Sequence, residues 1–364
     1  MASARDNAGL KPMPVSKYMV RAADMASDRD VVLALWGQAF PAPAQHPIKY
    51  DWCYGHTPQG VGRLYLLVYG EDGSVIGVQG IVPRRWWLHG EIKNMGICAD
   101  LVVDKQHRSI GPALAMVRQV IEIEHSSSHT ELLYGFPNTK SEALYRRAGY
   151  HKAGELTRYV RPLRLHVWLS RKGLPAIVAR VLAKPADLAR QLRVRFASLS
   201  AARHWRMVTV NEFDARFDAL WARVAATAFA PMVMRDSAFL RWRFGNHFAG
   251  QTRIMVLENR KNQIDGYVAY LVNPGNMVVV LDFLVADNTT MLSGLLNLFI
   301  CEMYQRHYAG VTLEFSGTES ISQTLLRCGF SPRETNPVYA VLNQTESGWL
   351  QGEPPYFTSC DRDQ

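Results

Sequence analysis

A short apolar strand that leads into a glycine-containing loop and then into a helix is the feature that most constrains this chain. The strand covers 101–103 and the loop covers 108–113. Pro112 has the fixed φ that suits a first helical position, so a helix is predicted over 112–124. The first amides of a helix lack backbone partners and lie at the positive end of its dipole. The loop therefore predicts an anion site, which Gly111 lets the backbone approach closely.

A second strand and helix follow in 132–150. The apolar run 132–136 predicts a buried strand. The stretch 137–150 has the pattern of a turn, a short helix and a stop at Gly149. The two segments together give the order strand, helix, strand, helix.

In this order and spacing, the two segments resemble the GNAT acetyltransferase superfamily. The acetyl-coenzyme A (acetyl-CoA) loop of that family reads (Arg/Gln)-x-x-Gly-x-(Gly/Ala), which Arg108, Gly111 and Ala113 match. Its later signature is an asparagine followed by a helix that carries a tyrosine four residues before Gly-(Phe/Tyr). The matching residues are Asn138, Tyr145, Gly149 and Tyr150.

The resemblance implies which residues bind the cofactor. Acetyl-CoA or another acyl-CoA is the expected cofactor, and no metal is expected. The thioester would lie in a gap between two splayed strands, and the loop would wrap the diphosphate. The implied binding residues are Leu101, Val102, Val103, Arg108, Ser109, Ile110, Gly111, Ala113 and Asn138.

Two residues are predicted to act in catalysis. Tyr145 would protonate the departing thiolate, with a place in the aromatic core as the alternative. Asp100 would take the proton of the attacking amine, although aspartate is a weak base at neutral pH. A water relay and a structural carboxylate stay open for Asp100, and a helix cap stays open for Asn138.

Composition limits the classes to which the protein can belong. With 364 residues, 48% of them apolar, the chain is long enough for two domains. It has no apolar run of 18 residues, so no membrane-spanning helix is predicted. Its five cysteines are scattered without a CxxC pair, which argues against a zinc site or a disulfide framework. A reducing cytoplasm is the expected location.

The positive charge is concentrated in one segment. The net charge is +9, and residues 161–206 carry eleven lysines and arginines against Asp187 alone. The rest of the chain is close to neutral, so general nucleic-acid binding is not implied.

The predicted fold class is α/β (α+β), with two tandem GNAT-like domains. Each would be a mixed, mostly antiparallel twisted sheet flanked by helices, and two strands near 151–163 would close the first sheet. The predicted segments are a flexible leader (1–16), a catalytic GNAT domain (17–163), a basic helical connector (164–205), a degenerate GNAT-like domain (206–345) and a tail (346–364).

The connector is expected to form two helices, over 175–184 and 185–198, each opened by a proline. The second helix sets arginines beside apolar residues. Such a helix fits peripheral contact with an anionic membrane, or equally a pair of interdomain helices whose arginines are solvated.

The second half repeats the order of elements but not the motifs. Its strand-to-helix loop, 286–291, has neither glycine nor arginine. Leu325 stands where the first copy has Tyr145. This half is expected to keep the fold without the cofactor.

The predicted function is acyl-CoA-dependent N-acyltransfer, with acetyl passed directly to the primary amine of a small molecule such as an amino sugar of the cell envelope. A monomer or homodimer is expected, and nucleic acid is not an expected partner. Three alternatives remain open: a Fem-like transferase that uses aminoacyl-tRNA, a CoA-binding protein without activity, and an acyltransferase for longer chains.

Overall fold

The computed structural model describes six stretches of the chain. They are residues 17–127, 129–228, 230–245, 251–287, 289–342 and 352–362. The predicted leader, 1–16, lies outside the described residues, as does the predicted tail apart from 352–362.

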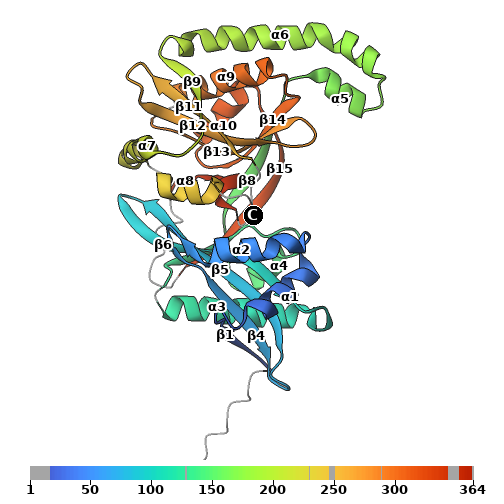
Figure 1. Ribbon diagram of the computed structural model, residues 1–364, viewed down its shortest axis with the longest axis vertical. Coiled ribbons are helices and arrows are strands. Elements are labelled where there is room, and N and C mark those ends of the chain that lie inside the picture. Colours follow the sequence, from blue (N-terminus) through green and yellow to red (C-terminus); the bar gives the residue numbers. More distant parts are fainter. Residues whose placement is uncertain are drawn as a thin grey trace, which may run out of the picture.

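One sheet runs through the described chain (Figure 1). Neighbouring strands are antiparallel except for β6 with β7 and β13 with β14, which are parallel. The predicted mixed, mostly antiparallel sheet is confirmed. The order across it is β1 (Tyr18–Ala22), β4 (Arg63–Tyr69), β5 (Val75–Leu88), β6 (Glu91–Val103), β7 (Leu132–Gly135), β15 (Ser331–Leu342), β8 (His151–Pro162), β14 (Gly310–Ser316), β13 (Met277–Val285), β12 (Ile264–Val272), β11 (Arg253–Asn259) and β9 (Trp205–Val210).

The two halves exchange strands. β15 comes from the C-terminal half but lies between β7 and β8, while β8 pairs with β14 of the other half. The prediction of two closing strands near 151–163 is therefore wrong, because that stretch is one strand. At about 3.3 Å per residue, the 12 residues of β8 extend far enough to join both halves, and Figure 1 shows β8 and β15 crossing between them.

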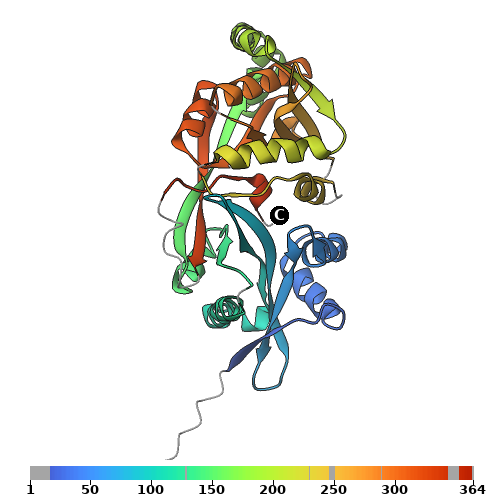
Figure 2. The same ribbon diagram turned by 90° about the vertical axis from the view of Figure 1, so that its left-hand side faces the viewer.

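Helices cover both faces of the sheet. In the N-terminal half, α3 lies on one face and α1 and α2 lie on the other (Figure 2). The helices are α1 (Arg29–Ala39), α2 (His46–Tyr54), α3 (Ile110–Ser126), α4 (Glu142–Arg147), α5 (Leu165–Arg171), α6 (Ala176–Ala202), α7 (Ala215–Thr227), α8 (Ser237–Phe244), α9 (Thr289–Gln305) and α10 (Glu319–Arg327). Short strands complete the structure: β2 (His56–Thr57), β3 (Gly60–Val61), β10 (Met232–Val233) and β16 (Phe357–Thr358).

Two helices differ from the prediction at a proline. α3 begins at Ile110, so Pro112 is its third residue rather than its first. The proline still costs nothing there, because no amide in the first turn has an intrahelical partner. The connector forms one long helix, α6, where two were predicted. Pro185 does not end it, because Ala183 and Val194 are buried on either side of the proline in a helix that packs against α9.

One hydrophobic core runs through both halves. At its centre, the ring centroids of Trp86 and Phe357 lie 5.3 Å apart, and those of Tyr134 and Phe357 lie 5.7 Å apart. Trp86 and Tyr134 come from the first half, and Phe357 comes from the C-terminal segment 352–362. These aromatic side chains therefore join the first half to the C-terminal segment.

A buried ion cluster holds the C-terminal segment in place. The Arg235 side chain is fully buried, with Nε 3.2 Å from Asp282 Oδ2 and Nη2 2.6 Å from Asp361 Oδ2. Thr358 Oγ1 donates to Asp282 Oδ1 at 2.7 Å. One guanidinium thus links β13 to the last described residues of the chain.

We expect Arg235→Met to destabilise the fold by about 3–5 kcal/mol, because it leaves two buried carboxylates without their cation. Urea unfolding followed by circular dichroism measures the loss. Arg195→Met is the matched control: Arg195 is exposed on α6, so the change in free energy of unfolding should stay within about 0.5 kcal/mol. Equal stability of the two variants would contradict the role assigned to the cluster.

Candidate active site

The parallel pairing of β6 and β7 ends early and leaves a gap. The two strands pair from Met95 with Leu132 to Ile97 with Tyr134. β6 then continues to Val103, while β7 ends at Gly135. Beyond Ile97, the backbone groups of β6 that face this side have no partner strand among the described residues.

Asp100 lies in a β-bulge at the edge of this gap. The register between β5 and β6 shifts between Val78 and Gly80, so two residues of β6 lie opposite one residue of β5. Asp100 has a φ of +52°, in the left-handed region that aspartate tolerates better than most residues. The bulge turns a buried carboxylate toward the gap.

Two donors from α2 hold that carboxylate. Lys49 Nζ lies 2.5 Å from Asp100 Oδ1, and Tyr54 Oη donates to Asp100 Oδ2 at 2.7 Å. Gly80 makes room for this tyrosine, because a Cβ at position 80 would stand only 1.9 Å from the Tyr54 hydroxyl. Asp100 is therefore an ion-paired, hydrogen-bonded carboxylate.

Tyr145 approaches the gap from the β7 side. It lies on α4, and a Cβ on Gly135 would stand 2.6 Å from its hydroxyl, so this glycine makes room for the phenol. Its ring centroid lies 4.7 Å from that of Tyr150. Tyr150 Oη lies 3.0 Å from Cys98 Sγ, and burial raises the pKa of Tyr150 well above its usual value.

A cavity of about 290 Å³ lies between these groups. It brings together four residues predicted from the sequence, Asp100, Leu101, Asn138 and Tyr145. Sequence reasoning missed Lys49 and Gln79, because neither belongs to a motif. The lining consists of Phe40, Lys49, Gln79, Cys98, Ala99, Asp100, Leu101, Phe136, Pro137, Asn138, Ser141 and Tyr145.

Gln79 offers the cavity an unused acceptor. The residue is 2% exposed, and its Oε1 has no hydrogen-bond partner in the part of the chain that the structure describes. Buried amide oxygens are rarely left unpaired, because losing water without gaining a partner is costly. Gln79 therefore points to a ligand with a donor group.

The other predicted binding residues lie around the start of α3. Val102 and Val103 are buried and pair with β5, so only their backbone could take part. The Ser109 amide donates to His107 O, and the Ser109 side chain does not cap the helix. Arg108, Ile110 and Gly111 are exposed, and Ala113 is partly buried.

The start of α3 suits a diphosphate. Because Pro112 has no N–H and the Ser109 amide is already bonded, the amides of Ile110 and Gly111 are the first-turn donors left over. The nearest atom to a Cβ on Gly111 would be Ser109 Oγ, 4.0 Å away, so the fold leaves open space there. The fold itself does not require this glycine, whereas close approach of a ligand would.

The Asn138 side chain forms a turn. Its Oδ1 accepts from the amides of Lys140 and Ser141, at 3.0 and 3.1 Å. The local geometry thus agrees with the capping alternative, and Asn138 still lines the cavity.

In the second half, the chain itself enters the corresponding gap. β13 and β14 pair in parallel from Met277 with Gly310 to Val280 with Leu313 and then separate. β16 pairs with the far end of β14. The Tyr356 hydroxyl donates to the Phe283 carbonyl on β13, so the C-terminal segment bridges the two strands.

A family model described as "Acetyltransferase (GNAT) domain" matches residues 20–153. These residues include the splayed strands, the bulge, the loop and α4. The chain contains a GNAT acetyltransferase domain. The presence of this domain makes the protein an acyltransferase. The GNAT fold is one that uses acyl-CoA. No curated protein matches the sequence significantly.

Solved structures share the fold at low identity. A GCN5-related N-acetyltransferase from Anabaena variabilis has a TM-score of 0.63 at 14% identity, over 90% of this chain and 73% of that chain. A probable N-acyltransferase from Enterococcus faecalis has a TM-score of 0.62 at 14% identity, over 90% and 73% of the two chains. The N-myristoyltransferase of Saccharomyces cerevisiae with bound myristoyl-CoA has a TM-score of 0.56 at 10% identity, over 95% and 90%.

Proposed function

We propose that the protein transfers acetyl from acetyl-CoA to the primary amine of a small polar molecule. The observation that carries the proposal is the gap between β6 and β7, which has the Tyr145 hydroxyl on one side and an unpaired strand edge on the other. Acetyl-CoA, when bound, supplies the activated acyl group. The cavity is at the small end of the range for ligand pockets, which favours a short acyl group over a long chain.

The residues that would hold the cofactor follow the gap. The unpaired edge of β6 at 101–103 would lie beside the pantetheine, and the amides of Ile110 and Gly111 would bind the diphosphate. Arg108 is exposed next to them and adds positive charge. Asn138 would close the side of the gap at the end of β7.

Tyr145 is proposed as the general acid. It is 9% exposed and lines the cavity, so its hydroxyl can give a proton to a thiolate that leaves through the gap. Tyr150, packed beside it, is more deeply buried and does not line the cavity.

Asp100 is proposed to act on the amine through water. Its two oxygens already accept from Lys49 and Tyr54, which favours a relay over direct abstraction. Gln79 Oε1 would accept an N–H of the acceptor and so orient it. The polar lining suits an amino sugar of the cell envelope, and this acceptor class is proposed by analogy alone.

The second half is proposed to be a GNAT-like domain without a cofactor. Its elements repeat the first half, and Leu325 is fully buried where the first half has Tyr145. The C-terminal segment lies between its splayed strands. We keep 17–163, 164–205 and 206–345 as the proposed units, joined by the exchanged strands.

We also propose peripheral contact between α6 and an anionic membrane. Along α6, eight apolar side chains are 43–78% exposed. At about 100° per residue they fall within an arc of roughly 140°, opposite the buried face that holds Ala183 and Val194. They are Ile177, Val178, Val181, Leu182, Leu188, Leu192, Phe196 and Leu199.

The charges on α6 favour a lipid surface over a second copy of the chain. The helix carries five lysines and arginines against one aspartate, and Lys184 and Arg195 lie at one edge of the apolar arc. Two such helices side by side would repel each other, whereas anionic lipid would attract both. No helix in the described part of the chain has the length and apolar content needed to cross a bilayer.

Gly111→Glu should weaken acetyl-CoA binding at least about a hundredfold, because it sets a carboxylate against the diphosphate. Isothermal titration calorimetry measures the affinity. Gly111→Ala is the matched control: its Cβ meets open space, so its thermal unfolding should match that of the wild-type protein, and it should lose less affinity than Gly111→Glu because it adds no charge. Wild-type affinity in Gly111→Glu would move the cofactor away from this loop.

Tyr145→Phe should leave acetyl-CoA affinity unchanged and lower kcat by about a hundredfold or more, because only the proton donor is lost. Steady-state kinetics with a small amine acceptor measures it. Tyr150→Phe, which removes a neighbouring hydroxyl outside the cavity, should keep most of the activity. If the two variants are equally active, Tyr145 is not the acid.

The double substitution Val181→Ser/Phe196→Ser should abolish sedimentation with phosphatidylglycerol-containing vesicles, because it removes apolar area from the exposed arc of α6. The wild-type protein should pellet at low salt and be released as salt rises. Ile92→Ser, at an exposed apolar side chain on β6, is the control. Failure of the wild-type protein to pellet would end the membrane proposal.

A further inference from the structure

Two adjoining cavities form a groove in the second half, on the inner side of α6. The first, of about 840 Å³, lies between the end of α6, the β11–β12 turn, the start of α9 and the end of α10. The second, of about 580 Å³, continues between α6, α9 and the start of β15. Ala197, Ser293, Asn297 and Arg327 line both, so the two cavities are continuous.

Among the residues that the structure describes, the groove is lined by cations and by no acid. The second cavity has Arg161, Arg190, Arg193, Arg327 and Arg333, and the first adds Arg260 and Lys261. Neither lining includes an aspartate or a glutamate. None of these seven side chains forms an ion pair within the described residues, although many other arginines of the protein do.

One of these cations, Arg161, is partly buried. Arg161 is only partly exposed, and burial together with nearby Arg193 lowers its pKa. The Arg161 guanidinium packs against Gly329, which has a φ of +80°. A Cβ at this position would stand 3.3 Å from Arg161 Cζ, so glycine makes room for the guanidinium. Holding a desolvated cation beside another cation is unfavourable unless an anion joins them.

A buried hydroxyl beside Arg161 adds a further polar group. Tyr304 is 3% exposed and lines the second cavity. Its Oη makes no hydrogen bond of normal geometry within the described chain. Burial raises the pKa of Tyr304, and the nearby Arg161 guanidinium opposes that rise. A ligand oxygen in this cavity would meet both groups.

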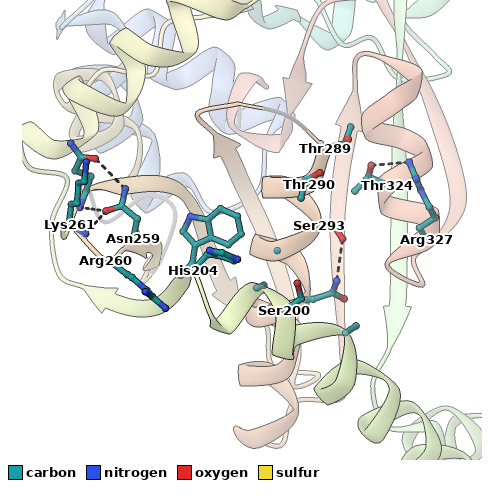
Figure 3. Close-up of a pocket in the computed structure, with 16 residues that line it drawn as sticks. Ser200, His204, Asn259, Arg260, Lys261, Thr289, Thr290, Ser293, Thr324 and Arg327 are labelled. Atoms are coloured by element: carbon teal, nitrogen blue, oxygen red, sulfur yellow. Dashed lines mark hydrogen bonds between the residues drawn. The ribbon is translucent and has the colours of Figure 1, made fainter.

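The first cavity has a different character. Figure 3 shows Asn259, Arg260 and Lys261 on one side, Thr290 and Arg327 on the other, and His204 between them. Trp205 also lines it, with its indole N–H bonded to Asp265. Amide, hydroxyl and ring groups of this kind suit a polar ring such as a sugar or a base.

We propose that this groove is a second binding site, which takes a ligand bearing a diphosphate. The phosphates would lie over the arginines of the second cavity, and an attached polar ring would lie in the first. Guanidinium groups bind phosphate oxygens in pairs, which explains why arginine rather than lysine predominates. The proposal does not depend on the acetyl-CoA site, because the groove uses elements of the other half.

Calorimetry of the full chain with inorganic diphosphate at low salt tests the proposal. Arg193→Gln removes an exposed arginine of the groove and should weaken binding about tenfold. Arg195→Gln, two residues away on the same helix and outside the groove, is the matched control and should leave the affinity unchanged. Gly111→Glu should also keep this binding, which separates the groove from the loop at α3.

Absence of diphosphate binding to the wild-type chain would overturn the proposal. So would a result in which Gly111→Glu loses diphosphate binding while Arg193→Gln keeps wild-type affinity. Sedimentation with phosphatidylglycerol vesicles then identifies the source of the phosphate. Each substitution removes one positive charge from α6, so both should weaken pelleting through the apolar arc to the same extent. A greater loss of pelleting in Arg193→Gln than in Arg195→Gln would assign the groove to a lipid headgroup. Equal loss in the two variants, with the calorimetric difference intact, would assign it to a soluble diphosphate.

Discussion

The candidate active site depends on where one pair of strands stops pairing. Up to Ile97, β6 and β7 are packed so closely that a Cβ on Gly96 would stand 2.7 Å from the Ile81 side chain and 2.8 Å from Leu133. A few residues later, Gly135 makes room for the Tyr145 hydroxyl. Tight packing before the gap and free space after it turn a continuous sheet into a site with an unpaired edge.

The exchange of β8 and β15 gives this gap a rigid far wall. β7 is only four residues long and would be an exposed edge if β15 did not pair with it. β15 is in turn paired with β8, which continues into the other half. The second half thus supports the site, while its own gap takes the C-terminal segment, which Arg235 ties to β13.

The sequence was enough to predict the secondary structure of the candidate site where it belongs to local motifs. The loop at Gly111 and the helix with Tyr145 each follow their own strand, so short-range pattern was enough to place them. Lys49 and Gln79 could not be found this way, because only the tertiary fold brings them to Asp100. The strand exchange was missed for the same reason: nothing local to β8 records that its neighbour lies in 331–342.

That exchange also governs how the protein is made. Tyr339 pairs with Gly135, so the part of the sheet in the first half includes a contact between residues about two hundred positions apart. During synthesis the N-terminal half leaves the ribosome long before its missing strand, with β7 and β8 still open at their edges. Folding of the first half must therefore wait until residues 331–342 have been made, which implies slow assembly and a period when chaperones would have to shield those strands.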